Sequence, residues 1–344
     1  MTDAAERERA SWFAVDVHVP DRTFGMLDIG LPVVERSTFL DNRIEAPWQH
    51  ARQVPVDAFS GLPVPDRLGW LFHTSFCCST LLARALHVGP AQVVLREPLV
   101  LRRLGDARRA GWPVDEFVAP AVALLGRPWE PGGSVIVKPT HAALGLASAL
   151  LAASAAPAIF LTSSLDDFLV SNIKKTRETQ ARIPELAERA LSASQFGRLL
   201  PPAALAPPDL LAAAALQWAA QRMIGVELTR SDMGSRIRWL EAAQLLSDPE
   251  RAVLAAARWL GTAVDESHLR QRARDEGSRH AKAVSRPYGP EVRALEAAAI
   301  RERYDGELKA ALAWFARHVE PHLPDDVLAM PGLEGVPAAV LSPA

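Results

Sequence analysis

Short apolar runs recur along the middle of the chain and alternate with stretches of helical spacing. Helical spacing of apolar residues appears first at Leu81, Leu82, Ala85 and Leu86, and again at Phe117, Val118, Val122 and Leu125. Continuously apolar strands that alternate with helices are typical of a parallel sheet covered by helices on both faces. The pattern therefore predicts a doubly wound parallel α/β sheet with flanking helices. The expected strands are residues 68–73, 91–95, 134–137, 158–161 and 236–240.

The helices between these strands carry recognisable start and stop signals. Asp209 follows a proline pair, and Asp248 precedes Pro249, so both aspartates are expected N-caps. Gly261 is expected to end the second of these helices. The expected helices are residues 81–87, 99–104, 114–125, 142–153, 166–175, 209–232, 248–260 and 291–318.

The rest of the chain divides into an appendage, an excursion and a tail. Residues 1–66 are rich in proline, with strand-like pieces at 12–19 and 38–40, and predict an N-terminal appendage of short strands and loops. The main domain is expected over residues 67–322, followed by a proline-rich tail over 323–344. Within the main domain, the polar segment 176–208 predicts a mobile excursion or lid, and residues 275–287 predict a basic loop.

Composition narrows the class of protein. The chain has 344 residues, 49% of them hydrophobic, and a formal net charge of −2, which gives no reason to expect nucleic-acid binding. The first thirty residues lack an apolar signal core, and the apolar residues 141–160 are interrupted by Pro157, so no membrane contact is expected. The two cysteines, Cys77 and Cys78, are adjacent, which disfavours a disulfide and favours a cytoplasmic protein. A homo-oligomer remains open.

A cluster of small and hydroxyl residues follows the first expected strand. Residues 74–80 read TSFCCST and lead directly into a helix. Ligands of open α/β sheets bind beyond the carboxyl ends of the strands, and free amides at a helix start attract anions. The GxxxxGK[ST] motif fits poorly, because its glycine, glycine and lysine positions fall on His73, Cys78 and Ser79, and only Thr80 matches. A conventional ATP or GTP hydrolase is therefore not expected.

Residues 78–82, CSTLL, resemble the GSTLL part of the 5′-phosphosulfate loop of sulfotransferases. The run from 236 to 261 is similar to the closing sheet element of that family. The resemblance implies a fold like that of the mononucleotide kinases and the donor 3′-phosphoadenosine 5′-phosphosulfate (PAPS). It also implies that the loop binds the 5′-phosphosulfate through His73, Thr74, Ser75, Phe76, Cys77, Cys78, Ser79 and Thr80.

The family also holds the 3′-phosphate of its donor, with an arginine and a serine in an RxPxDxxxS pattern. In residues 161–171 the serine is matched by Ser171, and Ser163 stands where the arginine would be. Lys174 and Lys175 follow closely and are expected to supply the missing charge. Lys282, in the RHAK segment of the basic loop, resembles the family loop that closes over the nucleotide. The family's basic residue before the serine–glycine pair is replaced by Phe76.

Transfer of a sulfuryl group needs a base for the acceptor proton and positive charge near the transferring group. Glu97 ends the second strand, where we expect it to lie next to the loop, and is the first candidate base, with His141 and His73 as alternatives. Lys138 is expected to stabilise the transferring group. Each residue also has a structural interpretation, such as a salt bridge of Glu97 with Arg96 or Arg84. Cys77 and Cys78 are expected to pack, although a thiol at a helix start can be a nucleophile. No metal-ligand spacing is recognisable.

These observations predict an enzyme that transfers a sulfuryl group from PAPS to a hydroxyl or amine of a small-molecule acceptor. Two other interpretations remain open. One is a phosphotransferase on the same fold, with Mg²⁺ bound by Thr80 and an acidic residue. The other is a catalytically silent module that binds a nucleotide or a protein.

Overall fold

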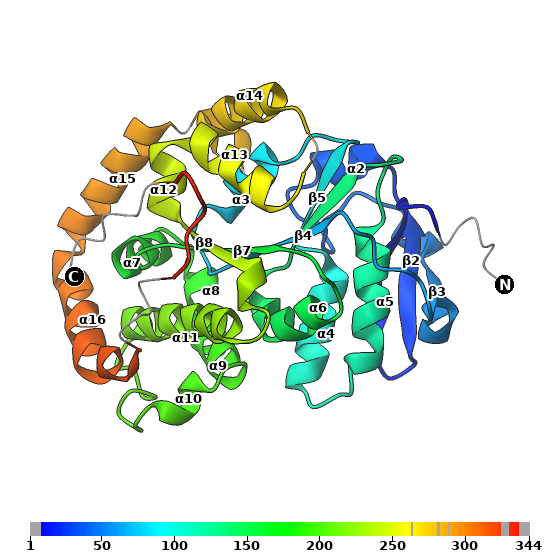
Figure 1. Ribbon diagram of the computed structural model, residues 1–344. Coiled ribbons are helices and arrows are strands. Elements are labelled where there is room, and N and C mark those ends of the chain that lie inside the picture. Colours follow the sequence, from blue (N-terminus) through cyan, green and yellow to red (C-terminus); the bar gives the residue numbers. More distant parts are fainter. Residues whose placement is uncertain (1–7, 263, 281–282, 288, 325–329, 337–344) are drawn as a thin grey trace.

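The chain folds around a five-stranded parallel sheet. The computed structural model describes residues 8–262, 264–280, 283–287, 289–324 and 330–336. The strand order in the sheet is β5-β6-β4-β7-β8, and every neighbouring pair is parallel (Figure 1). This confirms the expected doubly wound α/β class, and each expected strand lies within one residue of an observed one. The strands are β4 (Leu68–His73), β5 (Gln92–Arg96), β6 (Ser134–Lys138), β7 (Ala158–Thr162) and β8 (Ile237–Glu241).

The first strand of this sheet is also its central one. The chain leaves β4, forms the edge strand β5, and returns to place β6 between the two. The expectation that Glu97 would lie directly beside the loop after β4 is therefore wrong, because β6 separates β5 from β4. The register pairs Arg96 with Lys138, so the residues that follow β5 and β6 meet at the same edge.

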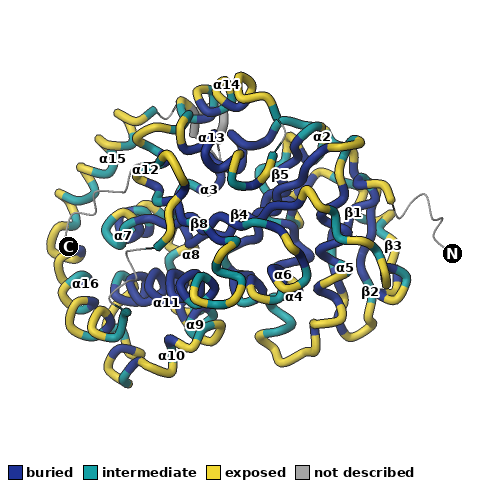
Figure 2. Tube along the Cα trace, viewed as in Figure 1, coloured by how far each residue is buried: buried dark blue, intermediate teal, exposed yellow. Residues whose placement is uncertain are grey.

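Helices cover both faces of the sheet (Figure 1), and the strands between them are buried (Figure 2). Alternate residues of β4 belong to two different cores. Trp70 and Phe72 face the larger core, whereas Leu71 faces the smaller one. The larger core lies under α4 (Leu99–Arg109), α5 (Asp115–Gly126), α6 (Ala147–Ala152), α7 (Leu165–Ile173) and α11 (Leu210–Arg230). The smaller one lies under α3 (Ser79–Ala85), α12 (Ala242–Ser247), α13 (Pro249–Trp259) and α14 (Glu266–Gly277).

The predicted caps are in place. Asp209 accepts a hydrogen bond from the N–H of Ala212 at 2.8 Å, and Asp248 accepts one from Arg251 at 3.0 Å. Gly261 follows α13 with a φ of 68°, a left-handed conformation that glycine adopts without steric cost. The stop and start signals in the sequence therefore fix the ends of α11 and α13.

The N-terminal part forms a separate three-stranded antiparallel sheet, in the order β1-β2-β3. It shares the larger core with the main sheet, since Phe13 and Phe24 belong to the same buried cluster as Trp70. The expected strand at 38–40 is wrong: Leu40 lies in a loop whose N–H and C=O bond to Arg96 and Leu99 at the sheet edge. The elements are β1 (Trp12–His18), β2 (Thr23–Asp28), α2 (Leu31–Arg36), η1 (Trp48–His50), β3 (Arg52–Pro55) and η2 (Val56–Phe59).

Two segments are more helical than expected. The excursion 176–208 contains three short helices, and one of them, α9, packs along α11. This segment is therefore an ordered part of the helical layer that includes α11. The region expected as a basic loop begins inside α14 and continues into a β9–β10 hairpin. The elements are α8 (Arg177–Gln180), α9 (Ile183–Ser192), α10 (Phe196–Leu199), β9 (Arg279–His280) and β10 (Ala283–Pro287).

The last described residues return to the main sheet. The N–H of Trp239 in β8 donates to the carbonyl of Pro331 at 2.8 Å, and Trp239 forms an isolated parallel bridge with Gly332. The tail therefore contacts the outer edge of β8. The remaining elements are η3 (His141–Leu146), η4 (Gly234–Arg236), α15 (Pro290–Arg303), α16 (Asp305–His318) and η5 (Glu320–His322). No helix among the described residues combines the length and apolarity that a membrane crossing would require.

Candidate functional site

The loop between β4 and α3 makes a tight, irregular turn. Phe76 and Cys78 both have positive φ angles, 57° and 63°, which side chains with a Cβ adopt only at a cost. Cys78 occupies the position of the glycine in the resembled GSTLL motif. The backbone at this position is thus the left-handed one that a glycine would favour, even though the glycine itself is replaced.

Some N–H groups of the loop bond to acceptors inside the protein, and others have no acceptor among the described residues. Thr74 donates to the carbonyl of Leu161 at 3.0 Å, and Ser75 donates to Oε1 of Gln221 at 2.9 Å. Both amides therefore complete bonds inside the protein, and the binding of a ligand by Thr74 and Ser75 stays a prediction. Within the described part of the chain, the N–H groups of Phe76, Cys77 and Thr80 have no acceptor.

Two glutamines of α11 hold the loop from one side. Gln217 donates from Nε2 to the hydroxyl of Ser75 at 3.0 Å, and the amide of Gln221 bonds to both the backbone and the hydroxyl of Ser75. Gln221 also lies 3.3 Å from Nδ1 of His141. Both glutamines are buried and lie four residues apart on one helix face. The signal for them is in the sequence, since they are polar residues inside an alanine-rich helix.

Three buried polar atoms around the loop lack a hydrogen-bond partner among the described residues. They are Nε2 of His73, Oγ of Ser163 and Oε1 of Gln217. Each unpaired group of this kind costs about 1–3 kcal/mol, so three of them near one loop require an explanation. A polar ligand that enters here would pair them.

Lys138 and Glu97 form a buried ion pair at the ends of β6 and β5. Nζ of Lys138 lies 2.5 Å from Oε1 of Glu97, and the lysine side chain is fully buried. Burial is the largest single influence and opposes ionisation of Glu97, but the charge and hydrogen bond of Lys138, together with the nearby His73 and His141, outweigh it and lower the pKa of Glu97 to about 2. A carboxylate with this pKa is a weak base at neutral pH.

His73 is held as a neutral imidazole. Its Nδ1 lies 2.8 Å from the carbonyl oxygen of Thr74, which fixes the proton on Nδ1 and leaves a lone pair on Nε2. Burial, and then the charge of Lys138, lower the pKa of His73 well below its usual 6.5. The ring of His141 is 6.1 Å away, centroid to centroid, so the two histidines share one edge of the site.

The residues expected around a 3′-phosphate have separate environments. Ser163 is buried with its unpaired hydroxyl, whereas Ser171 lies in α7 and is half-buried. Lys175 lies 4.9 Å above the ring of Phe76, which brings a positive charge to the loop. Lys174 forms an ion pair with Glu296 of α15 at 2.9 Å. Lys282 lies outside the described residues.

The cysteines are packing residues. The thiol of Cys77 is buried and contacts the carbonyl of Thr74 at 3.1 Å. Burial raises the pKa of Cys77 to about 12, so it stays protonated and is a poor nucleophile. Cys78 is half-buried, and both cysteines are free.

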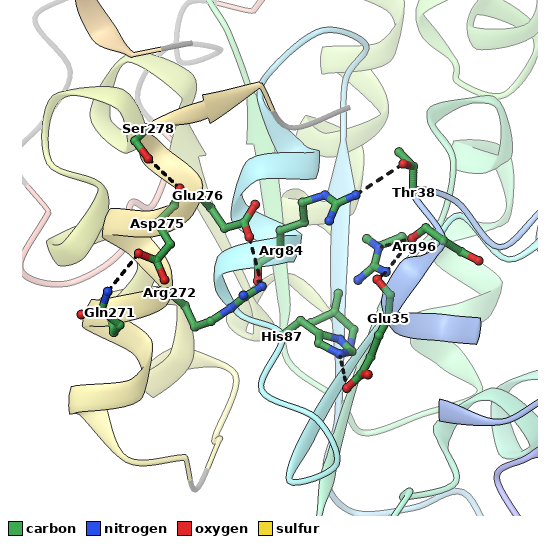
Figure 3. A network of polar contacts seen from close by, with 12 residues as sticks. Glu35, Thr38, Arg84, His87, Arg96, Gln271, Arg272, Asp275, Glu276 and Ser278 are labelled. Carbon is green, nitrogen blue, oxygen red and sulfur yellow. Dashed lines mark hydrogen bonds and ion pairs between the residues drawn. The ribbon is translucent and has the colours of Figure 1, made fainter. Parts of the chain in front are cut away.

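Several arginine side chains near the sheet were not predicted to matter from the sequence. Arg222 of α11 lies at the ends of β7 and β8, where it bonds to Glu241 at 2.9 Å and reaches Thr162 at 3.4 Å. A second cluster lies beyond α3 and β5 (Figure 3). There Arg96 donates to carbonyls at the end of α2, and Arg272 bonds to Glu276 and to the carbonyl of Arg84. These contacts fasten α2 to the sheet and α14 to α3.

The candidate site therefore combines a polar turn at the centre of a parallel sheet with a lysine, two histidines and two glutamines around it. Among the described residues, no group of three or more His, Cys, Asp or Glu side chains is arranged to hold a metal ion. The molecule is a doubly wound α/β protein whose candidate site is a loop at the carboxyl edge of the sheet.

Comparisons with known proteins show a distant likeness in fold. No protein-family model matches the chain, and no curated protein matches it. Among solved structures, the fold is similar to a sulfotransferase domain from the curacin biosynthetic pathway, at 13% identity and a TM-score of 0.40. The match covers 73% of this chain and 98% of that domain. The chemistry of the loop has to be read from this chain's own residues.

Proposed function

We propose that the protein transfers a sulfuryl group from PAPS to a small-molecule acceptor. The observation that carries this proposal is the turn at 76–80, with a left-handed residue at the glycine position of the phosphosulfate loop and three N–H groups without an acceptor in the described chain. The unpaired atoms of His73, Ser163 and Gln217 add polar groups that a bound anion or its sugar would satisfy. Such donors bind phosphate and sulfate oxygens strongly because the acceptor is charged.

The reaction breaks one bond and forms one. The acceptor oxygen or nitrogen attacks sulfur, and the bond from sulfur to the bridging oxygen of the 5′-phosphate breaks. Its electron pair stays on the phosphate, which leaves adenosine 3′,5′-bisphosphate. The proton of the acceptor passes to a base, and the sulfated acceptor is the second product.

The proposal gives each side chain of the edge one role. Lys138 places positive charge near the transferring group, and Glu97 orients that lysine through their 2.5 Å contact. His73 accepts the acceptor proton at Nε2, because this nitrogen carries a lone pair and has no partner among the described residues, whereas Glu97 is held in its ion pair with Lys138. His141 lies beside it. Ser163, Ser171 and Lys175 face the 3′-phosphate.

Calorimetric titration tests the proposal. We expect adenosine 3′,5′-bisphosphate to bind more tightly than ADP, with or without Mg²⁺. The Lys175→Met variant should weaken the bisphosphate about tenfold, since one charge-assisted contact is worth about 1–3 kcal/mol, while the exposed Lys309→Met control on α16 leaves binding unchanged. Tighter binding of ADP would overturn the proposal and favour a phosphotransferase.

A protein that binds the nucleotide without turnover is the second candidate. It is favoured by the burial of the loop, in which Thr74, Ser75, Cys77, Ser79 and Thr80 are all buried. It is also favoured by the amides that Thr74 and Ser75 have already committed to the protein. Binding of the bisphosphate with no sulfuryl transfer to any acceptor would support this candidate.

A further inference from the structure

Three arginines gather where α14, α3, β5 and α2 meet (Figure 3). They are Arg84 of α3, Arg96 at the end of β5, and Arg272 of α14, and the first two are buried. Two carboxylates accompany them: Glu276, which is buried, and Glu35, whose side chain is 45% exposed. In this group, which we call the arginine cluster, the described carboxylates leave one positive charge unbalanced.

The contacts of the cluster do not remove this excess charge. The hydrogen bonds of Arg96 within the described chain go to backbone carbonyls at the end of α2, which carry no net charge. A third carboxylate close by, Asp275, bonds instead to Gln271 at 2.9 Å in an exposed position. Burial, and then the charge of Arg84, lower the pKa of Arg96 to about 10. An anion at the cluster would relieve this repulsion.

Three buried atoms of the cluster lack a hydrogen-bond partner among the described residues. They are Nε2 of His87, Nε of Arg272 and Oε2 of Glu276. Nδ1 of His87 accepts from the N–H of Val94 at 3.0 Å, so its proton lies on Nε2. The carboxylate of Glu35 is 3.9 Å from Nε2, too far for a hydrogen bond. The cluster therefore offers two unused donors, on His87 and Arg272, and one unused acceptor.

The unused acceptor restricts the kind of anion. Oε1 of Glu276 already lies 3.2 Å from Arg272, and Oε2 needs a donor. A ligand oxygen without a proton would be repelled there, because a carboxylate oxygen only accepts. The matching ligand is an oxyanion that still carries an O–H group. The side chains of Arg272 and Glu35 are 35% and 45% exposed, so the cluster reaches the surface at both residues.

We propose that the arginine cluster is a binding site for inorganic phosphate in its hydrogen-bearing form. The N–H groups of His87 and Arg272 donate to phosphate oxygens, and the phosphate O–H donates to Oε2 of Glu276. The negative charge of the ion balances the excess charge of the arginines. The bound ion would join α2 of the N-terminal part to α3 and α14. This site does not depend on the proposed sulfuryl transfer.

Calorimetric titration of the full-length protein at pH 8 tests the chemistry. Inorganic phosphate keeps one O–H group at this pH, whereas sulfate and methyl phosphate keep none. We expect phosphate to bind about tenfold more tightly than either of them, because only phosphate satisfies the acceptor on Glu276. No binding of phosphate, or equal binding of phosphate and sulfate, would overturn the proposal.

Two variants of α14 locate the ion. Glu276→Gln keeps the shape of the side chain and adds a donor, so the preference for phosphate over sulfate should fall below about threefold. Arg272→Met should weaken phosphate about tenfold. Arg274→Met is the matched control on the same helix, since the side chain of Arg274 is 58% exposed, and it should leave phosphate binding unchanged. Unchanged affinity and preference in both Glu276→Gln and Arg272→Met would refute the site.

The loop after β4 also has free N–H groups, so the experiment includes a variant near that loop. Lys175→Met should leave phosphate affinity unchanged and weaken adenosine 3′,5′-bisphosphate, whereas Arg272→Met should do the reverse. Loss of phosphate binding in Lys175→Met alone would assign the ion to the loop and overturn the proposal. If Arg272→Met fails to fold by circular dichroism, the conservative Glu276→Gln and the three probes on the wild type still decide.

Discussion

Replacing Glu97 by glutamine tests how strongly the buried ion pair stabilises the fold. The pKa of Glu97 lies at about 2 in the folded chain, against an ordinary value of 4.5. At about 1.4 kcal/mol per pH unit, this difference corresponds to about 3 kcal/mol of folding free energy at pH 7. The same size is expected from leaving the fully buried Lys138 without its counter-ion, which costs about 3–5 kcal/mol.

The pH dependence has a definite direction. Because folding depresses the pKa of Glu97, the stabilisation is complete above pH 4.5 and is lost as the pH falls toward 2. The difference in unfolding free energy between the wild type and Glu97→Gln should be about 3 kcal/mol at pH 7 and about 2 kcal/mol at pH 3.5. Urea denaturation monitored by circular dichroism measures both values.

Two further variants decide whether the reasoning is right. Glu302→Gln, at an exposed position of α15, should leave stability unchanged at both pH values. The double variant Glu97→Gln, Lys138→Met should recover part of the loss, because the unpaired buried charge is gone. A loss below about 1 kcal/mol in Glu97→Gln at pH 7, or a double variant less stable than Glu97→Gln, would refute the account of the pair.

Three other predictions concern packing and the loop. Cys78→Gly should leave the unfolding free energy from urea denaturation unchanged or raise it by up to about 1 kcal/mol, because the backbone of Cys78 has a left-handed conformation that glycine adopts at no cost. A clear loss of stability would contradict the idea that the backbone at Cys78 is strained. Cys77 should resist iodoacetamide at pH 7 in the folded protein and react after denaturation, as mass spectrometry would show, since burial raises its pKa to about 12; rapid labelling of the native protein would contradict this. Gly225→Ala should lower the unfolding free energy by about 1–3 kcal/mol, because its Cβ would lie 2.8 Å from Phe160 and Trp239. Gly306→Ala is the control, and equal melting temperatures of the two variants would contradict the tight packing around Gly225.

The sheet could be predicted because its strands are buried on both faces. Such strands need apolar residues at consecutive positions, and this leaves short runs like 134–137 and 158–161 that helices do not require. The order of the strands could not be read in the same way. Nothing in the sequence of β5 shows that β6 inserts beside β4, and so the position of Glu97 was misjudged.

Helix α14 was missed for a physical reason. Its buried side is narrow, with Leu269, Ala273 and Glu276 as the buried residues, so its sequence reads as polar and loop-like. Tertiary contacts rather than pattern make it a helix. Arg272, for example, bonds to the carbonyl of Arg84 at 2.9 Å across the interface with α3.

The turn after the first strand was predicted in its position, but its hydrogen-bond partners were not, and its role as a binding site stays a prediction. The loop after the first strand was located from its hydroxyl residues, but which amides remain available depends on Gln217 and Gln221, some 140 residues away in sequence. Such partners depend on how α11 packs over the loop. The sequence shows that these glutamines are polar, but it does not show that their side chains point toward the loop.

The contact between Trp239 and Pro331 has a consequence for handling the protein. An outer strand with unpaired N–H and C=O groups is a template on which a second chain can dock and aggregate. The returning tail occupies that row at β8. Shortened versions that stop before residue 331 would expose these groups of β8. We expect such versions to oligomerise or aggregate, even though they keep every helix and strand of the core.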